Sequence, residues 1–159
     1  PEQGAGDPPG VVRELADRCV FVRTVWLSRS FGQHPATLAG MASSGGDWIV
    51  TLDEDGQHDP AQIGRMLDVA LTERASLVYA EPTNPAPHGF LRNLASRTAK
   101  RVLAISAGGT NATEFQSYRL ILGEIGRSVA AYAGSGVYLD VAMGLVAGKV
   151  STCPIELRA

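Results

Sequence analysis

The residues best suited to chemistry lie in the segment Trp48–Pro60. Two carboxylates, Asp53 and Asp55, are separated by one residue, and the side-chain amide of Gln57 follows at the same spacing. Hard cations take oxygen ligands of these kinds. A cation bound here can in turn hold the phosphates of a nucleotide. The spacing therefore predicts a divalent-metal site, which is also the candidate active site.

A buried strand should position these carboxylates. The segment opens with an apolar run that includes β-branched residues, and short runs of this kind bounded by turn residues are typical of buried strands. Asp53 and Asp55 then lie at the carboxyl end of the strand, where Gly56 allows the chain to turn. Because ligands bind at the carboxyl ends of strands in open α/β sheets, this placement agrees with a functional site.

Helices and strands alternate around this strand. Before it, the sequence predicts a loop at Pro1–Gly10, a helix at Val11–Arg18, a strand at Val20–Leu27, a loop at Ser28–His34 and a helix at Pro35–Ser44. After it, Asp59 should cap a helix whose first residue is Pro60. Further along, the sequence predicts a strand at Ser76–Ala80, a loop at Glu81–Gly89, a helix at Phe90–Ile105, a strand within Phe115–Leu122, helices from Gly123 and over Tyr138–Val146, and a closing strand at Val150–Leu157. This alternation predicts an α/β domain of three layers with a mainly parallel central sheet.

Length and composition indicate one globular domain over residues 1–159, with a formal charge of -2 that gives no reason to expect nucleic-acid binding. Cys19 and Cys153 match no metal or redox spacing, which indicates a reducing compartment. No run of about 20 apolar residues and no signal peptide is visible, so we expect a location in the cytoplasm or at the cytoplasmic face of a membrane. Because the chain begins at Pro1 within a Gly/Pro-rich decapeptide, we interpret it as a fragment with a missing N-terminus.

Simpler interpretations of the acidic segment compete with catalysis. One is a polar turn after a buried strand, because turns favour Asp and Gly for local backbone reasons. Another is a calcium loop of the EF-hand type, which requires Gly at its sixth position and Glu at its twelfth. Counted from Asp53, these positions hold His58 and Gly64, so the sequence excludes an EF-hand.

Leu52–Gly56 also resembles the first motif of haloacid dehalogenase-type phosphatases, an apolar strand that ends in Asp-x-Asp-Gly. In those enzymes the first Asp attacks phosphorus and the second acts as acid and base, roles that would fall to Asp53 and Asp55. Gln57 stands where that family has Thr or Val, and its later Gly-Asp motif is missing. A phosphatase is therefore the second choice, and a non-catalytic metal-binding module also stays open.

An ordered set of motifs covers most of the chain and resembles a different family. The segments are Leu27–Gly32, Ala36–Gly40, Gly46-Asp47, Leu52–Pro60 and Phe115–Leu120. In this order they resemble family 2 glycosyltransferases, in particular the branch with dolichol-phosphate mannosyltransferase and the bacterial polyprenyl-phosphate glycosyltransferases. The whole set is much more specific than an Asp-x-Asp motif alone.

The resemblance implies a GT-A fold, here a partial domain that is expected to be truncated at both its N-terminal and its C-terminal end, and a site that uses Mg²⁺ or Mn²⁺. Asp53 would face the nucleotide and its ribose, with Ser28 and Arg29 as further donor-binding residues. Asp55 and Gln57 would ligate the metal, which neutralises the diphosphate leaving group as a Lewis acid. Both carboxylates are therefore expected to be catalytic.

The same resemblance implies roles for basic residues. Arg119 matches the family arginine near the diphosphate, where a guanidinium can bind phosphate oxygens in a bidentate way, and it is the third expected catalytic residue. Arg92, Arg97 and Glu114 are expected near a lipid-phosphate acceptor. The implied reaction is inverting sugar transfer from a nucleotide diphosphate to a polyprenyl phosphate, in cell-envelope or glycan biosynthesis. Membrane association is expected through segments outside this chain.

The chain departs from the family pattern at several points. The opening apolar strand and the following Asp-Asp-Gly-Ser turn, which hold the base, are absent, and Ser30 replaces the usual Asn. Ala80-Glu81 stands where the mannosyltransferases have an arginine, so the donor sugar is not assigned. Asp140 lies in an apolar helix and is expected as a cap or a surface residue, with a position in the cleft as the alternative. His58 is expected as a solvent-exposed side chain.

Overall fold

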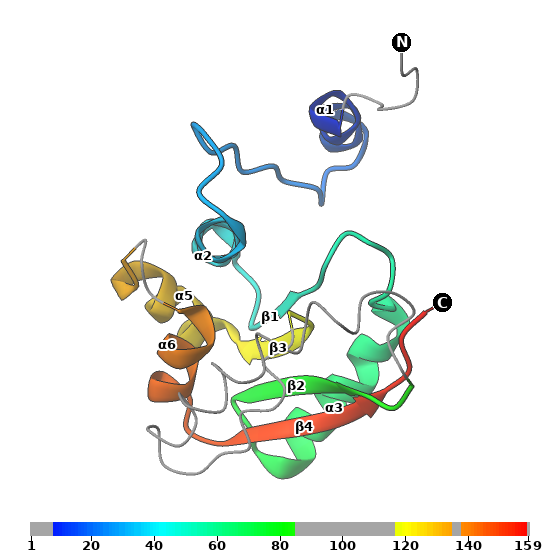
Figure 1. The fold of residues 1–159 in the computed structure, drawn as a ribbon, viewed down its shortest axis with the longest axis vertical. Coiled ribbons are helices and arrows are strands. Elements are labelled where there is room, and N and C mark those ends of the chain that lie inside the picture. The colour runs from blue at the N-terminus through cyan, green and yellow to red at the C-terminus, as the bar shows by residue number, and fades with distance from the viewer. Residues whose placement is uncertain (1–7, 85–116, 135–137, 159) are drawn as a thin grey trace, which may run out of the picture.

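The structure, a computed structural model, describes residues 8–84, 117–134 and 138–158, and these form a sheet with helices on both faces (Figure 1). The elements in chain order are α1 (Pro8–Arg18), α2 (Gln33–Ser43), β1 (Trp48–Thr51), the 3₁₀ turn η1 (Pro60–Gln62), α3 (Ile63–Glu73), β2 (Leu77–Pro82), β3 (Arg119–Leu122), α5 (Gly123–Tyr132), α6 (Leu139–Val146) and β4 (Val150–Ile155). The α/β class predicted from the sequence is confirmed.

The described strands form one four-stranded sheet in the order β1-β3-β2-β4. β2 and β4 are parallel, whereas β3 is antiparallel to both β1 and β2. Three strands therefore share one direction, as expected, but the reversed β3 between them makes the sheet mixed. The reversal was not predicted, because the residue pattern of a strand does not depend on its direction.

Two hydrophobic clusters cover the two faces of the sheet. Successive residues of a strand point to opposite faces, so Leu120 packs in one cluster and Ile121 in the other. Met66 and Ala70 of α3 belong to the first cluster, and buried residues of α2, α5 and α6 belong to the second. The result is the three-layer arrangement that the alternating pattern predicted, with the four-stranded sheet as the middle layer (Figure 1).

The helix starts follow from local chemistry. The Asp59 side chain accepts a hydrogen bond from the Ala61 N–H at 3.0 Å, which caps η1 as the sequence predicted, and Pro60 stands in the first turn. α2 begins at Gln33, directly after Gly32, whose φ of 91° lies in the region that favours glycine. The helix predicted at Val11–Arg18 is confirmed, although it begins earlier, at Pro8.

The strand predicted at Val20–Leu27 is wrong. This segment has no strand, and Val20 and Phe21 are 99% and 85% exposed. A strand needs a hydrogen-bonding neighbour, and none of the four described strands pairs with it. The segment instead extends from α1, which lies away from the sheet beyond α2 (Figure 1). The helix predicted at Phe90–Ile105 lies outside the described residues.

Candidate active site

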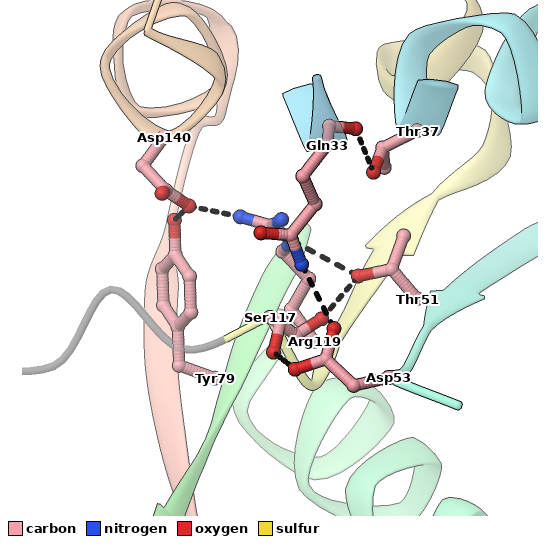
Figure 2. Close-up of polar contacts among 8 residues, drawn as sticks. All are labelled: Gln33, Thr37, Thr51, Asp53, Tyr79, Ser117, Arg119 and Asp140. Atoms are coloured by element: carbon pink, nitrogen blue, oxygen red, sulfur yellow. Dashed lines mark hydrogen bonds and ion pairs between the residues drawn. The ribbon is translucent and has the colours of Figure 1, made fainter. Parts of the chain in front are cut away.

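The candidate site lies at the edge of the sheet where β1, β2 and β4 end and β3 begins. At this edge Thr51 is paired with Arg119, and Arg119 with Tyr79, so one residue of each of three strands stands in a row. Asp53 lies two residues after the end of β1, and Asp140 lies in the first turn of α6. Figure 2 shows polar contacts that link Tyr79, Asp140, Arg119 and Thr51, and Ser117 connects Thr51 to Asp53.

Asp53 is held from two sides. The Gln33 side-chain amide donates from Nε2 to Asp53 Oδ1 at 2.8 Å, and the Ser117 hydroxyl donates to Asp53 Oδ2 (Figure 2). Gln33 is the first residue of α2 and Ser117 precedes β3, so two separate elements fix the orientation of one carboxylate. Neither residue was predicted as a site residue, although Ser117 lies in the Phe115–Leu120 motif.

Asp55 and Gln57 occupy the turn that follows. Asp55 is exposed and its Oδ1 accepts a hydrogen bond from the Gln57 N–H at 3.0 Å, while Gly56 between them has a φ of 81°. This turn is possible because glycine adopts positive φ without steric cost. The Gln57 side chain is half-buried.

The residues of this turn fit a Mg²⁺ or Mn²⁺ ion bound with the help of a substrate. Their side chains are hard oxygen donors, and the Asp55 carboxylate lies in solvent. Within the described residues no group of three His, Cys, Asp or Glu side chains is gathered that could enclose an ion. Mg²⁺ is commonly held by one or two carboxylates, with waters and substrate phosphates as the other ligands, so a small donor set is compatible with it.

Arg119 and Asp140 form a buried ion pair beside Asp53. They are 4% and 5% exposed, and Arg119 Nη1 donates to Asp140 Oδ1. Arg119 Nε also donates to Thr51 Oγ1 at 3.0 Å, and the Tyr79 hydroxyl donates to Asp140 Oδ1 at 3.2 Å (Figure 2). Burial and the charge of Asp140 raise the pKa of Tyr79 well above its ordinary value. The expectation that Asp140 is a cap or a surface residue is therefore wrong.

A chain of contacts joins this ion pair to Asp53. Thr51 Oγ1 accepts from Arg119 and donates to the backbone oxygen of Ser117, whose own hydroxyl donates to Asp53. The path runs through β1 and β3, which are hydrogen-bonded neighbours. Packed, hydrogen-bonded groups in a sheet hold side chains rigidly, so Asp53 and Arg119 form one prearranged unit.

The other predicted site residues make no hydrogen bond with Asp53 that the structure describes. Ser28 and Arg29 are exposed, and the Arg29 guanidinium lies 4.8 Å from the centre of the Phe31 ring. No hydrogen bond within the described part of the chain joins either residue to Asp53. The predicted acceptor-side residues lie outside the described residues: Arg92, Arg97 and Glu114.

Comparison with protein families decides the assignment. Residues 7–133 match the family model described as glycosyl transferase family 2. The chain belongs to glycosyl transferase family 2. This confirms the resemblance seen in the ordered motifs, and the α/β fold with its mixed sheet agrees with the GT-A fold that the resemblance implies. Membership in a family of transferases leaves the phosphatase interpretation without support.

Curated relatives are similar over parts of the chain. A protein of Mycobacterium tuberculosis (strain CDC 1551) named "Putative glycosyltransferases" is 30% identical over 103 residues, which cover 63% of this chain and 30% of the relative. An undecaprenyl-phosphate 4-deoxy-4-formamido-L-arabinose transferase of Erwinia tasmaniensis is 34% identical over 53% of this chain and 25% of the relative. The enzyme of the same name in Sodalis glossinidius is 48% identical over 43% of this chain and 22% of the relative. The chain thus spans less than a third of the length of these relatives.

Among the helices in the described ranges, none has both the length and the apolar character needed to cross a bilayer.

Proposed function

We propose that this domain takes part in a metal-dependent, inverting transfer of a sugar from a nucleotide-diphosphate donor to a polyprenyl phosphate. Membership in glycosyl transferase family 2 supports the transfer, and two relatives are named as undecaprenyl-phosphate sugar transferases. The observation that carries the proposal is the arrangement of Asp53 and Asp55 at the end of β1, beside the buried cation of Arg119.

On the donor side, Asp53 binds the nucleotide and its ribose, with Ser28 and Arg29 as further contacts. Gln33 and Ser117 each occupy one oxygen of the Asp53 carboxylate. Because each carboxylate oxygen can accept more than one hydrogen bond, the carboxylate retains capacity for ribose hydroxyls. The two protein donors supply the fixed orientation that such recognition requires.

Asp55 and Gln57 would hold Mg²⁺ or Mn²⁺ at the diphosphate. The chemistry that this cation supplies when bound is the neutralisation of negative charge on the departing diphosphate. Asp55 suits the role because its carboxylate is exposed and lies one residue from the bend at Gly56.

Arg119 adds positive charge to the same edge of the sheet. Its Nη1 and Nε groups are engaged with Asp140 and Thr51, which hold the guanidinium plane in place. The Nη2 group of the guanidinium is the donor that we assign to a diphosphate oxygen. A guanidinium stays charged at any physiological pH, so its contribution does not depend on proton transfer.

In the transfer step, an oxygen of the acceptor phosphate attacks the anomeric carbon, and the bond from that carbon to the nucleotide diphosphate breaks with its electron pair going to the diphosphate. The acceptor oxygen is already anionic, so no protein base has to remove a proton. Arg92, Arg97 and Glu114 are the acceptor-side residues in this proposal. A polyprenyl-phosphate acceptor implies a reaction at a membrane, and we propose the cytoplasmic face as its side.

The test uses the intact protein, undecaprenyl phosphate in detergent or vesicles, and a panel of labelled nucleotide sugars. We expect one donor to transfer label to the lipid fraction with Mg²⁺ or Mn²⁺ and not with EDTA. NMR of the product should show the anomeric configuration opposite to that of the donor. Label that stays in the water-soluble fraction with every donor, or a product with retained configuration, would contradict the proposal.

A further inference from the structure

His58 is buried, although it stands in the polar turn after β1 and was expected in solvent. Its side chain is 8% exposed. The imidazole ring stacks on Tyr118 with ring centres 4.9 Å apart and an angle of 26° between the planes. Tyr118 is itself fully buried in the hydrophobic cluster on the α3 face of the sheet. The expectation that His58 is a solvent-exposed side chain is therefore wrong.

The ring of His58 makes a specific contact with the candidate site. Its Nδ1 atom accepts a hydrogen bond from the backbone N–H of Asp53 at 2.9 Å. An imidazole nitrogen that accepts must carry a lone pair, so this contact also fixes the tautomer with hydrogen on Nε2. This hydrogen bond joins the first and last residues of the turn 53–58, and Asp55 lies in the middle of that turn.

The C-terminal end of the turn, at Gln57 and Asp59, is fixed by other contacts. The Tyr118 hydroxyl donates to the backbone oxygen of Asp59 at 2.7 Å, and the backbone N–H of Arg158 donates to the oxygen of Gln57 at 2.9 Å. Arg158 Nη2 also lies 2.7 Å from Asp59 Oδ1. With His58 at one end and these contacts at the other, the backbone between Asp53 and Asp59 is held at both ends while its acidic middle remains exposed.

We propose that His58 is a positioning residue, which closes the turn so that Asp55 and Gln57 are presented together to a divalent cation. The inference rests on the proposed metal-dependent function. Its physical basis is preorganisation, because ligands already held in place lose less conformational freedom when the ion binds. Without the imidazole, the partly buried N–H of Asp53 loses its acceptor and the turn can open.

The test compares His58→Ala with His58→Asn, whose side-chain oxygen can replace Nδ1 as the acceptor. In the metal-free protein, we expect amide hydrogen exchange at Asp53 to be faster in His58→Ala than in wild type and to return toward the wild-type rate in His58→Asn. In the intact protein, the Mn²⁺ concentration for half-maximal binding, followed by electron paramagnetic resonance, should rise on the order of tenfold in His58→Ala. His58→Asn should recover most of that loss.

Val129→Ala is the matched control, because it removes buried methyl groups from the opposite face of the sheet. It should lower the melting temperature and leave Mn²⁺ binding unchanged, which separates positioning from general destabilisation. An Mn²⁺ titration of His58→Ala that overlays wild type would overturn the inference, as would equal losses in the Asn and Ala variants. If wild-type protein binds Mn²⁺ but shows no metal-dependent transfer, the proposed function fails while the assignment of His58 stands.

Discussion

Arg119 and Asp140 come from β3 and α6 and meet as an ion pair that is almost completely removed from solvent. Taking two charges out of water is costly, and the attraction between them offsets that cost only when their remaining hydrogen-bonding groups are satisfied. Here Thr51 and Tyr79 provide such partners. The pair therefore fixes α6 against the sheet and holds a permanent cation beside Asp53.

Removing one partner of this pair should be strongly destabilising. Asp140→Ala leaves the Arg119 charge buried without its partner, and we expect the free energy of unfolding to fall by about 3–5 kcal/mol. Urea denaturation measures this loss. Asp68→Ala, at an exposed carboxylate of α3, is the control and should change stability by less than about 0.5 kcal/mol. A loss below about 1 kcal/mol in Asp140→Ala would contradict the buried pair.

The double variant Arg119→Met with Asp140→Leu separates stability from function. Replacing a buried ion pair with apolar side chains of similar size is often neutral or stabilising, so this variant should recover most of the stability lost in Asp140→Ala. It should not recover transfer, because the cation assigned to the diphosphate is gone. Urea denaturation and the lipid-transfer assay test the two parts, and full activity in this variant would remove Arg119 from the mechanism.

The junction between β3 and α5 should tolerate no side chain at Gly123. A Cβ atom there would overlap the backbone oxygen of Gly46 and lie 2.9 Å from that of Asp47, and backbone cannot move aside as a flexible side chain can. We expect Gly123→Ala to cost about 1–3 kcal/mol or more of stability. Gly64→Ala, where α3 leaves open space, should instead gain about 0.5–1 kcal/mol. Equal effects of the two variants would contradict the close approach.

Stability should fall in alkaline solution because of two buried tyrosines. Burial is the main cause that raises the pKa of both Tyr79 and Tyr118, with further contributions from the charges of Asp140 and Asp59 respectively. Above about pH 10 the unfolded chain releases these protons while the folded chain keeps them. The folded state then binds more protons, so the free energy of unfolding decreases as pH rises, by about 1.4 kcal/mol per pH unit for each proton.

Urea denaturation at a series of pH values between 8 and about 11.5 checks this slope. Tyr79→Phe should reduce it, because the ionisable group is gone in both states. Tyr132→Phe is the control, since its ring is 90% exposed, and it should keep the wild-type slope. A stability that is flat up to pH 11 would contradict the burial of both hydroxyl groups in the folded state.

Much of the fold follows from local sequence signals. Three signals each specify a local structure without help from distant residues. They are the helix start at Asp59-Pro60, the spacing of apolar residues in α3 and the short apolar run before Asp53. The segment Val20–Leu27 has the composition of a strand, but composition does not provide a partner strand. The direction of β3 likewise depends on how the chain enters the sheet.

Only the part of the site that lies in one short segment was predicted, because sequence patterns report local structure. The carboxylates were found because Asp53 and Asp55 share one short segment. Their partners come from distant parts of the chain: Gln33 is 20 residues from Asp53, and Ser117 is 64 residues away. Such contacts form only when the fold brings α2 and β3 close to the end of β1, so no local sequence pattern predicts them.

Whether the end of β1 binds a catalytic metal can be tested by measuring metal-dependent transfer with an Asp55→Ala variant of the intact protein. Glu54→Ala is the matched control, because Glu54 is an exposed carboxylate in the same turn that has no metal role in this account. We predict that Asp55→Ala lowers Mn²⁺-dependent transfer of sugar to undecaprenyl phosphate by about a hundredfold or more, with unchanged melting temperature. Glu54→Ala should retain wild-type activity. Undiminished transfer by Asp55→Ala would contradict a metal site at the end of β1.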